Sequence, residues 1–255
     1  IYSAKDKQVC ADHDRASGEG VGPQEYTIVK LEIIQPYPEN SPLNCEALKG
    51  KRVYLAPATL RPETMYGQTN CFVLPEGKYG AYELANGDVL VVSARAAHGL
   101  AHQDYMTNWG ESVCLCPLSG TDLLGLPLKA PYAAYERIYT LPLLTISMFK
   151  GTGVVTSVPS DSPDDYVALR ELKEKPLWRE KFGITTEMVE PFEVIPIINI
   201  PEYGDMSAVT MCEKLDIKST KDAEKLKKAK DEVYLKGFYE GVMMVGECAG
   251  LKVCD

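Results

Sequence analysis

The chain is poor in the residues from which most nucleophilic and metal centres are built. It has only three histidines in 255 residues, so it signals no Ser–His or Cys–His catalytic system, which needs an imidazole as its base. Its eight cysteines include no Cys-x-x-Cys pair, a pattern that favours reduced, mostly buried thiols over a zinc site or a disulfide framework. His98 and His102 have metal-ligand spacing on a helix, but Gly99 stands where a zincin carries its glutamate, and no third ligand is indicated. We therefore expect no metal.

Long apolar runs and an excess of positive charge are also lacking. No stretch approaches the roughly 20 apolar residues of a membrane span, and the first residues do not resemble a signal peptide, so a soluble chain is expected. The formal net charge of −9 disfavours binding to an extended nucleic-acid surface, which needs many Lys and Arg contacts to phosphate. This net charge does not exclude binding of a single nucleotide end in a local polar pocket. Acidic residues interrupt the lysine cluster at 218–230, which favours a solvated helix face there.

Hydrophobic periodicity and turn signals predict a strand-rich domain with a few helices. Strands are expected at 29–33, 52–56, 70–74, 81–85, 88–92, 137–141, 153–158 and 192–200, and helices near 94–97, 163–175 and 220–235. Asn86-Gly87 predicts a hairpin turn. Since strands outnumber helices and follow one another in hairpin order, we expect a mixed α/β fold with a β-barrel-like core or strongly curved sheet and peripheral helices. A single domain over 1–255 is expected, with a loop or ribbon at 1–26, a core at 27–175 and a helical and strand extension at 176–255.

The first chemically suggestive segment is 58–70, which follows a strand-like run. It places Thr59, Thr64 and Thr69 beside Arg61. Hydroxyls at this density next to a guanidinium suit a pocket that hydrogen-bonds a small polar, anionic ligand. Threonine is also a good strand and turn former, so a purely structural role stays open.

The second such segment is 150–165. Gly151 and Gly153 allow close backbone approach to a ligand, and a strand follows them. Ser162 is then expected to cap a helix that has proline at its first position and Asp165 three residues after the cap, a capping-box pattern. The helix dipole favours a carboxylate there without any further function. Alternatively, Asp165 binds a cationic group such as a substrate α-ammonium, and the two roles are compatible.

Together these segments resemble the editing (connective polypeptide 1) domain of leucyl-tRNA synthetases of the eukaryotic cytosolic type. Residues 58–70 resemble its threonine-rich signature, and 151–165 resemble its glycine-threonine-glycine strand leading to an aspartate. Segments 18–26 and 234–241 extend the resemblance to nearly the whole chain. The editing domain of valyl-tRNA synthetase has an Arg-Pro-Glu-Thr-Met run like that at 61–65 and is the nearest alternative.

Two positions depart from the bacterial form of these signatures. Leu60 stands where a second adjacent threonine is usual, and Ser-Asp-Ser-Pro-Asp-Asp at 160–165 replaces a histidine-containing form. Both weaken any transfer of roles to Leu60, Asp161 and Ser162. The ATP-binding signatures of the synthetase, His-Ile-Gly-His and Lys-Met-Ser-Lys-Ser, are absent. The resemblance therefore implies a domain excised from a larger synthetase that does not form aminoacyl-adenylate by itself.

The resemblance implies a cytoplasmic activity that hydrolyses tRNA(Leu) mischarged with isoleucine, methionine or norvaline and spares leucyl-tRNA. Asp165 would hold the α-ammonium group, and Thr59 would lie by the ester or the attacking water. Thr64 would exclude the leucine side chain, and Arg61 would support the terminal adenosine. The other substrate contacts implied are Gly151, Thr152, Gly153, Thr156 and Val158.

The implied partners are the 3′-terminal aminoacyl-adenosine of tRNA(Leu) and the rest of the synthetase in cis, with no cofactor, metal or membrane. The lack of a well-placed histidine is consistent with water positioned by threonine hydroxyls and a substrate ribose hydroxyl, without a dedicated general base. A hypothesis of a different class is a non-catalytic insertion that positions the tRNA end or binds a protein partner.

Overall fold

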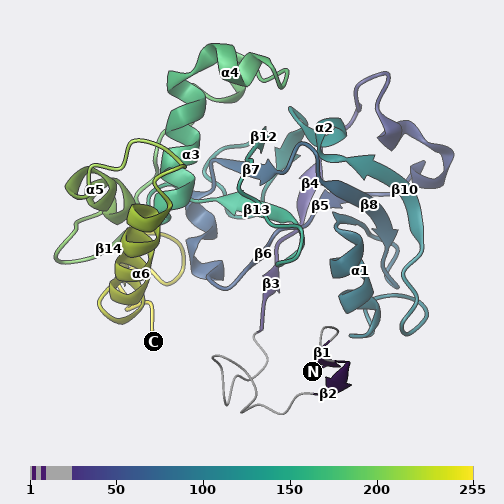
Figure 1. The fold of residues 1–255 in the computed structure, drawn as a ribbon, viewed down its shortest axis with the longest axis horizontal. Coiled ribbons are helices and arrows are strands. Elements are labelled where there is room, and N and C mark those ends of the chain that lie inside the picture. The colour runs from purple at the N-terminus through teal and green to yellow at the C-terminus, as the bar shows by residue number, and fades with distance from the viewer. Residues whose placement is uncertain (1, 4–6, 10–24, 255) are drawn as a thin grey trace.

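The computed structural model describes residues 2–3, 7–9 and 25–254, and its centre is a mixed sheet of nine strands (Figure 1). The strands are β4 (Leu31–Ile33), β5 (Val53–Leu55), β7 (Asn70–Val73), β8 (Lys78–Glu83), β9 (Val89–Val92), β10 (Cys114–Ser119), β11 (Pro127–Lys129), β12 (Ile138–Pro142) and β13 (Val154–Ser157). They are ordered β10-β8-β9-β5-β4-β11-β12-β7-β13 across the sheet. The pairs β5–β9 and β7–β12 are parallel, and the others are antiparallel.

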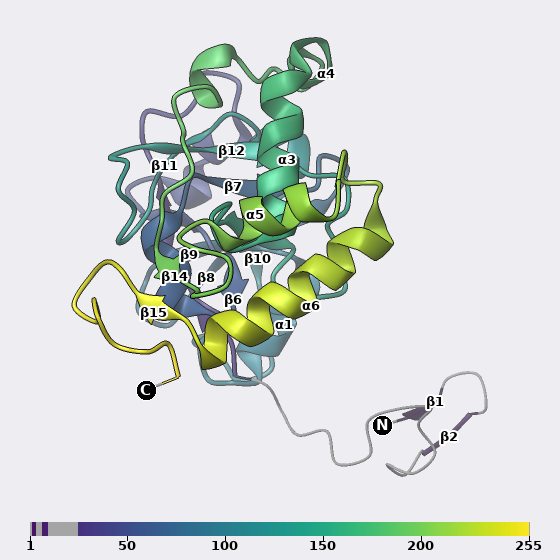
Figure 2. The same ribbon diagram turned by 90° about the vertical axis from the view of Figure 1, so that its left-hand side faces the viewer.

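The described part of the chain also contains three short strand pairs and several helices. The pairs are β1 (Tyr2–Ser3) with β2 (Gln8–Val9), β3 (Thr27–Ile28) with β6 (Ala58–Thr59), and β14 (Ile198–Asn199) with β15 (Val242–Met243). The helices are α1 (Ala94–Ala101), α2 (Gly120–Leu123), α3 (Pro163–Glu174), α4 (Pro176–Glu180), α5 (Ser207–Lys214) and α6 (Ala223–Tyr239). Helices α3, α5 and α6 pack on one another in front of the sheet in Figure 2, whereas α1 packs on β8. None of these helices is long and apolar enough to cross a membrane.

The helices are held by apolar faces with helical spacing. In α6, Leu226, Ala229 and Val233 are buried in the main hydrophobic core, three and four residues apart. Helix α3 is buried on two sides, because Val167 joins the main core while Leu172 and its neighbours pack against Phe72 of the sheet in a separate cluster. Full burial of one such side chain contributes about 1.5–3 kcal/mol. Packing therefore determines where α3 and the inner face of α6 lie.

Most predicted elements are present, and the differences have physical causes. The segment 192–200 forms only the short strand β14, because Pro196 interrupts it. Strand β10 was not predicted, because Pro117 weakens its signal; it lies at an edge of the sheet, where a missing backbone N–H is tolerated. Strand β11 and helices α2, α4 and α5 were not predicted either. The expected loop or ribbon at 1–26 lies largely outside the described residues.

The hairpin predicted at Asn86-Gly87 is confirmed and joins β8 to β9. Gly87 has φ +83° and donates to the carbonyl of Leu84 at 2.9 Å, while the N–H of Leu84 donates to Asp88 O at 2.8 Å. This is a three-residue loop with glycine in the left-handed region.

The mixed α/β class with peripheral helices is confirmed, but the barrel description holds only loosely. In the described residues the sheet is open, with β10 at one edge and β13 at the other. The free edge at β13 is where the site described next is found.

Candidate active site

A cavity of about 560 Å³ lies beside edge strand β13. Its walls are the threonine-rich segment, the loop from Leu143 to Lys150, the stretch from Gly151 to Asp165, and one face of α6. The two segments singled out in the sequence therefore face the same cavity.

The threonine-rich segment is folded tightly by its own hydroxyl groups. Its first part, β6, pairs with β3 so that Thr59 lies opposite Thr27, and a 3₁₀ helix, Pro62–Gly67, follows. Thr59 Oγ1 accepts the backbone N–H of Arg61 at 3.0 Å, which leaves the hydroxyl proton of Thr59 free to be donated. Thr64, only 5% exposed, donates its hydroxyl to the carbonyl of Arg61 at 2.8 Å. Both side chains line the cavity in a defined orientation.

Asp165 is a buried carboxylate of the cavity that has no ion-pair partner among the described residues. It lies in the first turn of α3 with 7% exposure. Its backbone N–H donates to the capping hydroxyl of Ser162 at 3.4 Å, but its Oδ2 accepts the backbone N–H of Val158 at 2.9 Å. Only half of the predicted capping box is therefore formed, because the carboxylate turns back toward the end of β13. Burial raises the pKa of Asp165 to about 7, against the lowering effect of the Val158 hydrogen bond.

Arg61 does not extend freely into the cavity. Its Nη1 is paired with Asp161, its Nε donates to Glu63 at 3.1 Å, and its guanidinium lies 4.7 Å from the ring centroid of Tyr234. Arg61 Nη2 and Asp161 Oδ1 are buried and have no hydrogen-bond partner in the described part of the chain. Arg61 thus joins the threonine-rich segment to the start of α3 and to α6.

Helix α6 supplies the fourth wall through Lys230 and Tyr234. Lys230 Nζ lies 3.1 Å from the carboxylate of Asp164 and 5.5 Å from the Tyr234 ring centroid. Burial raises the pKa of Tyr234 to about 12, so its hydroxyl stays protonated at neutral pH.

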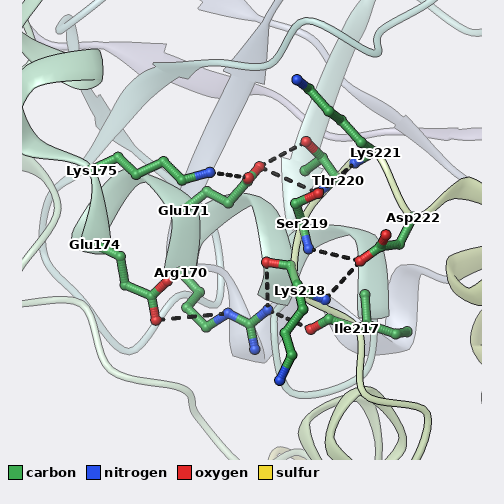
Figure 3. Close-up of polar contacts among 10 residues, drawn as sticks. All are labelled: Arg170, Glu171, Glu174, Lys175, Ile217, Lys218, Ser219, Thr220, Lys221 and Asp222. Atoms are coloured by element: carbon green, nitrogen blue, oxygen red, sulfur yellow. Dashed lines mark hydrogen bonds and ion pairs between the residues drawn. The ribbon is translucent and has the colours of Figure 1, made fainter.

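The start of α6 is anchored to α3 by the polar contacts drawn in Figure 3. Glu171 accepts both the hydroxyl of Thr220, at 2.7 Å, and the backbone N–H of the same residue, at 3.3 Å. Arg170 donates to the carbonyl of Ile217 at 2.7 Å, and Asp222 accepts two backbone N–H groups of the loop, at 2.7 and 3.1 Å. These contacts fix the height of α6 along α3 and so place Lys230 at the cavity.

The glycine-containing turn before β13 has a backbone that only glycine adopts readily. Gly151 and Gly153 have φ of +53° and +80°. A Cβ at Gly153 would lie 2.9 Å from Met148 Cε, whereas one at Gly151 would meet no heavy atom within 4 Å. The backbone of Gly151 is thus open to a ligand.

No metal site is formed in residues 2–3, 7–9 and 25–254 by three or more His, Cys, Asp or Glu side chains. His98 and His102 stack edge to face on α1, with ring centroids 4.4 Å apart, and His102 also packs on Trp109. Of the cysteines, Cys71, Cys116 and Cys212 are buried, Cys45 is half-buried, and Cys114, Cys248 and Cys254 are exposed. Burial was therefore predicted too broadly, and Cys10 lies outside the described residues.

Comparison with known proteins assigns the chain to a family. No family model matches the chain. It is 57% identical over 253 residues to the cytoplasmic leucine–tRNA ligase of Arabidopsis thaliana and 56% identical to that of Dictyostelium discoideum; these matches include 99% and 100% of the chain but 23% and 24% of the relatives. The crystal structure of GlLeuRS-CP1 is 41% identical with a TM-score of 0.80, over 90% of this chain and 92% of that one. The chain belongs to the leucyl-tRNA synthetase editing-domain family.

A second editing domain, from the cytosolic leucyl-tRNA synthetase of P. knowlesi, matches with 28% identity and a TM-score of 0.80, over 91% of this chain and 89% of that one. The family assignment favours the leucyl enzyme over the valyl alternative. The chain spans about a quarter of the length of the curated relatives named above.

Within this editing domain, the cavity brings together nearly all the residues that the sequence singled out. Thr59, Arg61, Thr64, Gly151, Gly153, Thr156, Val158 and Asp165 line it. Thr152 does not: its side chain donates to Val154 O at 3.3 Å, and its carbonyl accepts the N–H of Ser93 at 2.8 Å.

Sequence reasoning predicted helix α6 but missed its contribution to the wall of the cavity. The lysine cluster at 218–230 was predicted to be a solvated face, and Lys227, Lys228 and Lys230 are indeed exposed, but Lys230 also lines the cavity and pairs with Asp164. The one available signal was the spacing of four between Lys230 and Tyr234, which puts both on one helix face.

Proposed function

We propose that this editing domain hydrolyses the ester of tRNA(Leu) mischarged with isoleucine, methionine or norvaline, in the cytoplasm, while the rest of the synthetase holds the tRNA body in cis. The observation that carries the proposal is the position of Asp165, a buried carboxylate in a cavity that also holds Thr59 and Thr64. The 3′-terminal aminoacyl-adenosine is the part of the tRNA that enters. The name "cytoplasmic" of the relatives supports the location.

In this proposal, Asp165 binds the α-ammonium of the substrate. Ionising a carboxyl group in this cavity is unfavourable without a partner, as the raised pKa indicates. A bound ammonium group supplies the missing positive charge and favours the ionised form. The buried carboxylate therefore selects a ligand that carries a cationic group. An aminoacyl ester carries an ammonium group, whereas a deacylated tRNA end does not.

The hydrolytic step uses a water molecule held against the ester. The free hydroxyl proton of Thr59 can be donated to the ester oxygen or to that water, and a ribose hydroxyl of the substrate completes the positioning. Arg61 supports this arrangement indirectly, because its ion pair with Asp161 holds the threonine-rich segment against α3. The backbone at Gly151 and Gly153 contacts the adenosine, while Thr156 and Val158 line the amino-acid end.

Thr64 is proposed to exclude leucine. Its hydroxyl is held by the carbonyl of Arg61, so its methyl group is fixed and acts as a steric gauge. Discrimination by one methylene in a binding pocket alone is worth only about 1–3 kcal/mol, which is why a separate site that rejects the correct product by shape is useful.

The test uses the full-length synthetase that carries this domain. Wild type should deacylate isoleucyl-tRNA(Leu) and leave leucyl-tRNA(Leu) intact, whereas Thr64→Ala should hydrolyse both. Thr69→Ala, which alters a buried threonine of the same segment outside the cavity wall, is the matched control. If the Thr64→Ala enzyme still failed to hydrolyse leucyl-tRNA(Leu), the proposed role of Thr64 in excluding leucine would be contradicted.

A non-catalytic role in positioning the tRNA end is the second candidate. It predicts that Asp165→Ala leaves deacylation of isoleucyl-tRNA(Leu) unchanged, whereas the proposed reaction predicts its loss with helix content retained. Comparing isoleucyl-tRNA(Leu) with threonyl-tRNA(Val) separates leucyl from valyl editing.

A further inference from the structure

We propose that Lys150 binds the phosphate group on the 5′ side of the terminal adenosine, opposite the end of the cavity that takes the ammonium group. This inference rests on the proposed function, because it assumes that an aminoacyl-nucleotide occupies the cavity.

The argument begins with the charges that line the cavity. They are Arg61, Lys150, Asp161, Asp164, Asp165 and Lys230. Arg61 is paired with Asp161, and Lys230 is paired with Asp164 at 3.1 Å.

Two charges remain, one of each sign. Asp165 and Lys150 have no ion-pair partner within the described residues. A terminal aminoacyl-nucleotide carries one ammonium group and one adjoining phosphate, so the two unpaired side chains complement it.

The positions of the two charges agree with the shape of such a ligand. Lys150 precedes strand β13, whereas Asp165 follows its far end. A strand of four residues extends about 13 Å at ~3.3 Å per residue. This is the scale of one nucleotide bearing an aminoacyl group, which can therefore lie along β13 with its phosphate at the Lys150 end.

The turn next to Lys150 leaves room for a ligand to approach the backbone closely. Gly151 has open space where a Cβ would stand. Arg95, exposed on the first turn of α1, donates to the carbonyl of Gly151 at 2.8 Å and adds a second positive charge at this turn. Among the described residues, neither Lys150 nor Arg95 is paired with a carboxylate, so the charge at this turn is positive.

The test measures two analogues in which norvaline is joined to 3′-amino-3′-deoxyadenosine by an amide that is not hydrolysed. One carries a 5′-phosphate and the other a 5′-hydroxyl. Their affinities for the full-length synthetase are measured by calorimetry and by inhibition of isoleucyl-tRNA(Leu) deacylation. The variants are Lys150→Gln, Lys150→Arg and, as a control, Lys228→Gln, an exposed lysine outside the cavity.

Wild type should prefer the 5′-phosphate analogue. Lys150→Gln should bind that analogue roughly tenfold more weakly, the lower end for a hydrogen bond between charged groups, and should bind the 5′-hydroxyl analogue as wild type does. Lys150→Arg should keep the preference, and Lys228→Gln should change neither affinity.

Equal weakening of both analogues by Lys150→Gln, or no preference in wild type, would overturn the inference while leaving the proposed function intact. Failure of wild type to bind either analogue and to deacylate isoleucyl-tRNA(Leu) would instead overturn the proposed function and this inference with it.

Discussion

Replacing Asp165 by asparagine should stabilise the domain at alkaline pH while abolishing its activity. Burial raises the pKa of Asp165 to about 7 from an ordinary value of 3.8, so the folded state resists the ionised form. Because asparagine is uncharged and its side-chain oxygen can still accept the N–H of Val158, the substitution removes the cost of ionisation and keeps the hydrogen bond.

The sign and size follow from proton linkage. Between pH 3.8 and about 7 the folded state binds more protons at Asp165 than the unfolded state does, so this group lowers stability as the pH rises through that window. Each pKa unit corresponds to about 1.4 kcal/mol, which gives roughly 4 kcal/mol above pH 7. For a protein of this size, that is a rise in Tm of about 8–16 °C for the variant.

The assay is urea and thermal unfolding of wild type and Asp165→Asn at pH 4, 6 and 8, with deacylation measured in parallel. The two proteins should be nearly equal in stability at pH 4 and diverge toward pH 8. Asp231→Asn, on the exposed face of α6, is the matched control and should show no such divergence. A stability difference that does not depend on pH, or a variant less stable at pH 8, would refute the reasoning.

Two further perturbations test how the walls of the cavity are held together. Arg61→Met leaves the carboxylate of Asp161 buried without its cation, so urea denaturation should show a loss of about 3–5 kcal/mol. Adding Asp161→Asn should recover part of this loss, and no recovery would argue against the ion pair as its cause. Glu171→Ala removes the hydrogen bonds to Thr220 and Lys175 and should cost about 1–3 kcal/mol at pH 7. Although burial opposes it, those hydrogen bonds lower the pKa of Glu171 below 4.5, so the cost should be present above pH 4.5 and shrink as the pH falls through the folded-state pKa; a cost independent of pH would contradict this origin.

Local sequence signals predicted the elements on either side of the cavity well. Ser162 caps α3 as expected, and Gly87 closes the β8–β9 hairpin, because these structures depend on hydrogen bonds between residues close in the chain. The direction of the Asp165 side chain was not predictable in the same way. The capping-box pattern predicts that the carboxylate of Asp165 accepts the backbone N–H of Ser162. It accepts the N–H of Val158 instead, because the end of β13 also presents a backbone N–H that needs an acceptor.

Helix α5 could not be predicted from the helix propensities of its residues. Its sequence, Ser-Ala-Val-Thr-Met-Cys-Glu-Lys, includes several residues that favour helices only weakly. Ala208, Met211 and Cys212 are nevertheless fully buried, against α3 and α6. Tertiary packing therefore decides this helix, and no local pattern announces it.

By itself, the sequence determined the two signature segments, their threonine, glycine and aspartate residues, and the family to which they belong, because these features are local and specific. Only the tertiary structure decided which charges of the cavity are already paired. Arg61 meets Asp161 across 100 positions of the chain, and Lys230 reaches Asp164 from a helix fixed by its contacts with α3. Such pairs depend on the packing of whole elements, so no spacing in the chain predicts them, and they leave Asp165 and Lys150 as the charges available to a ligand.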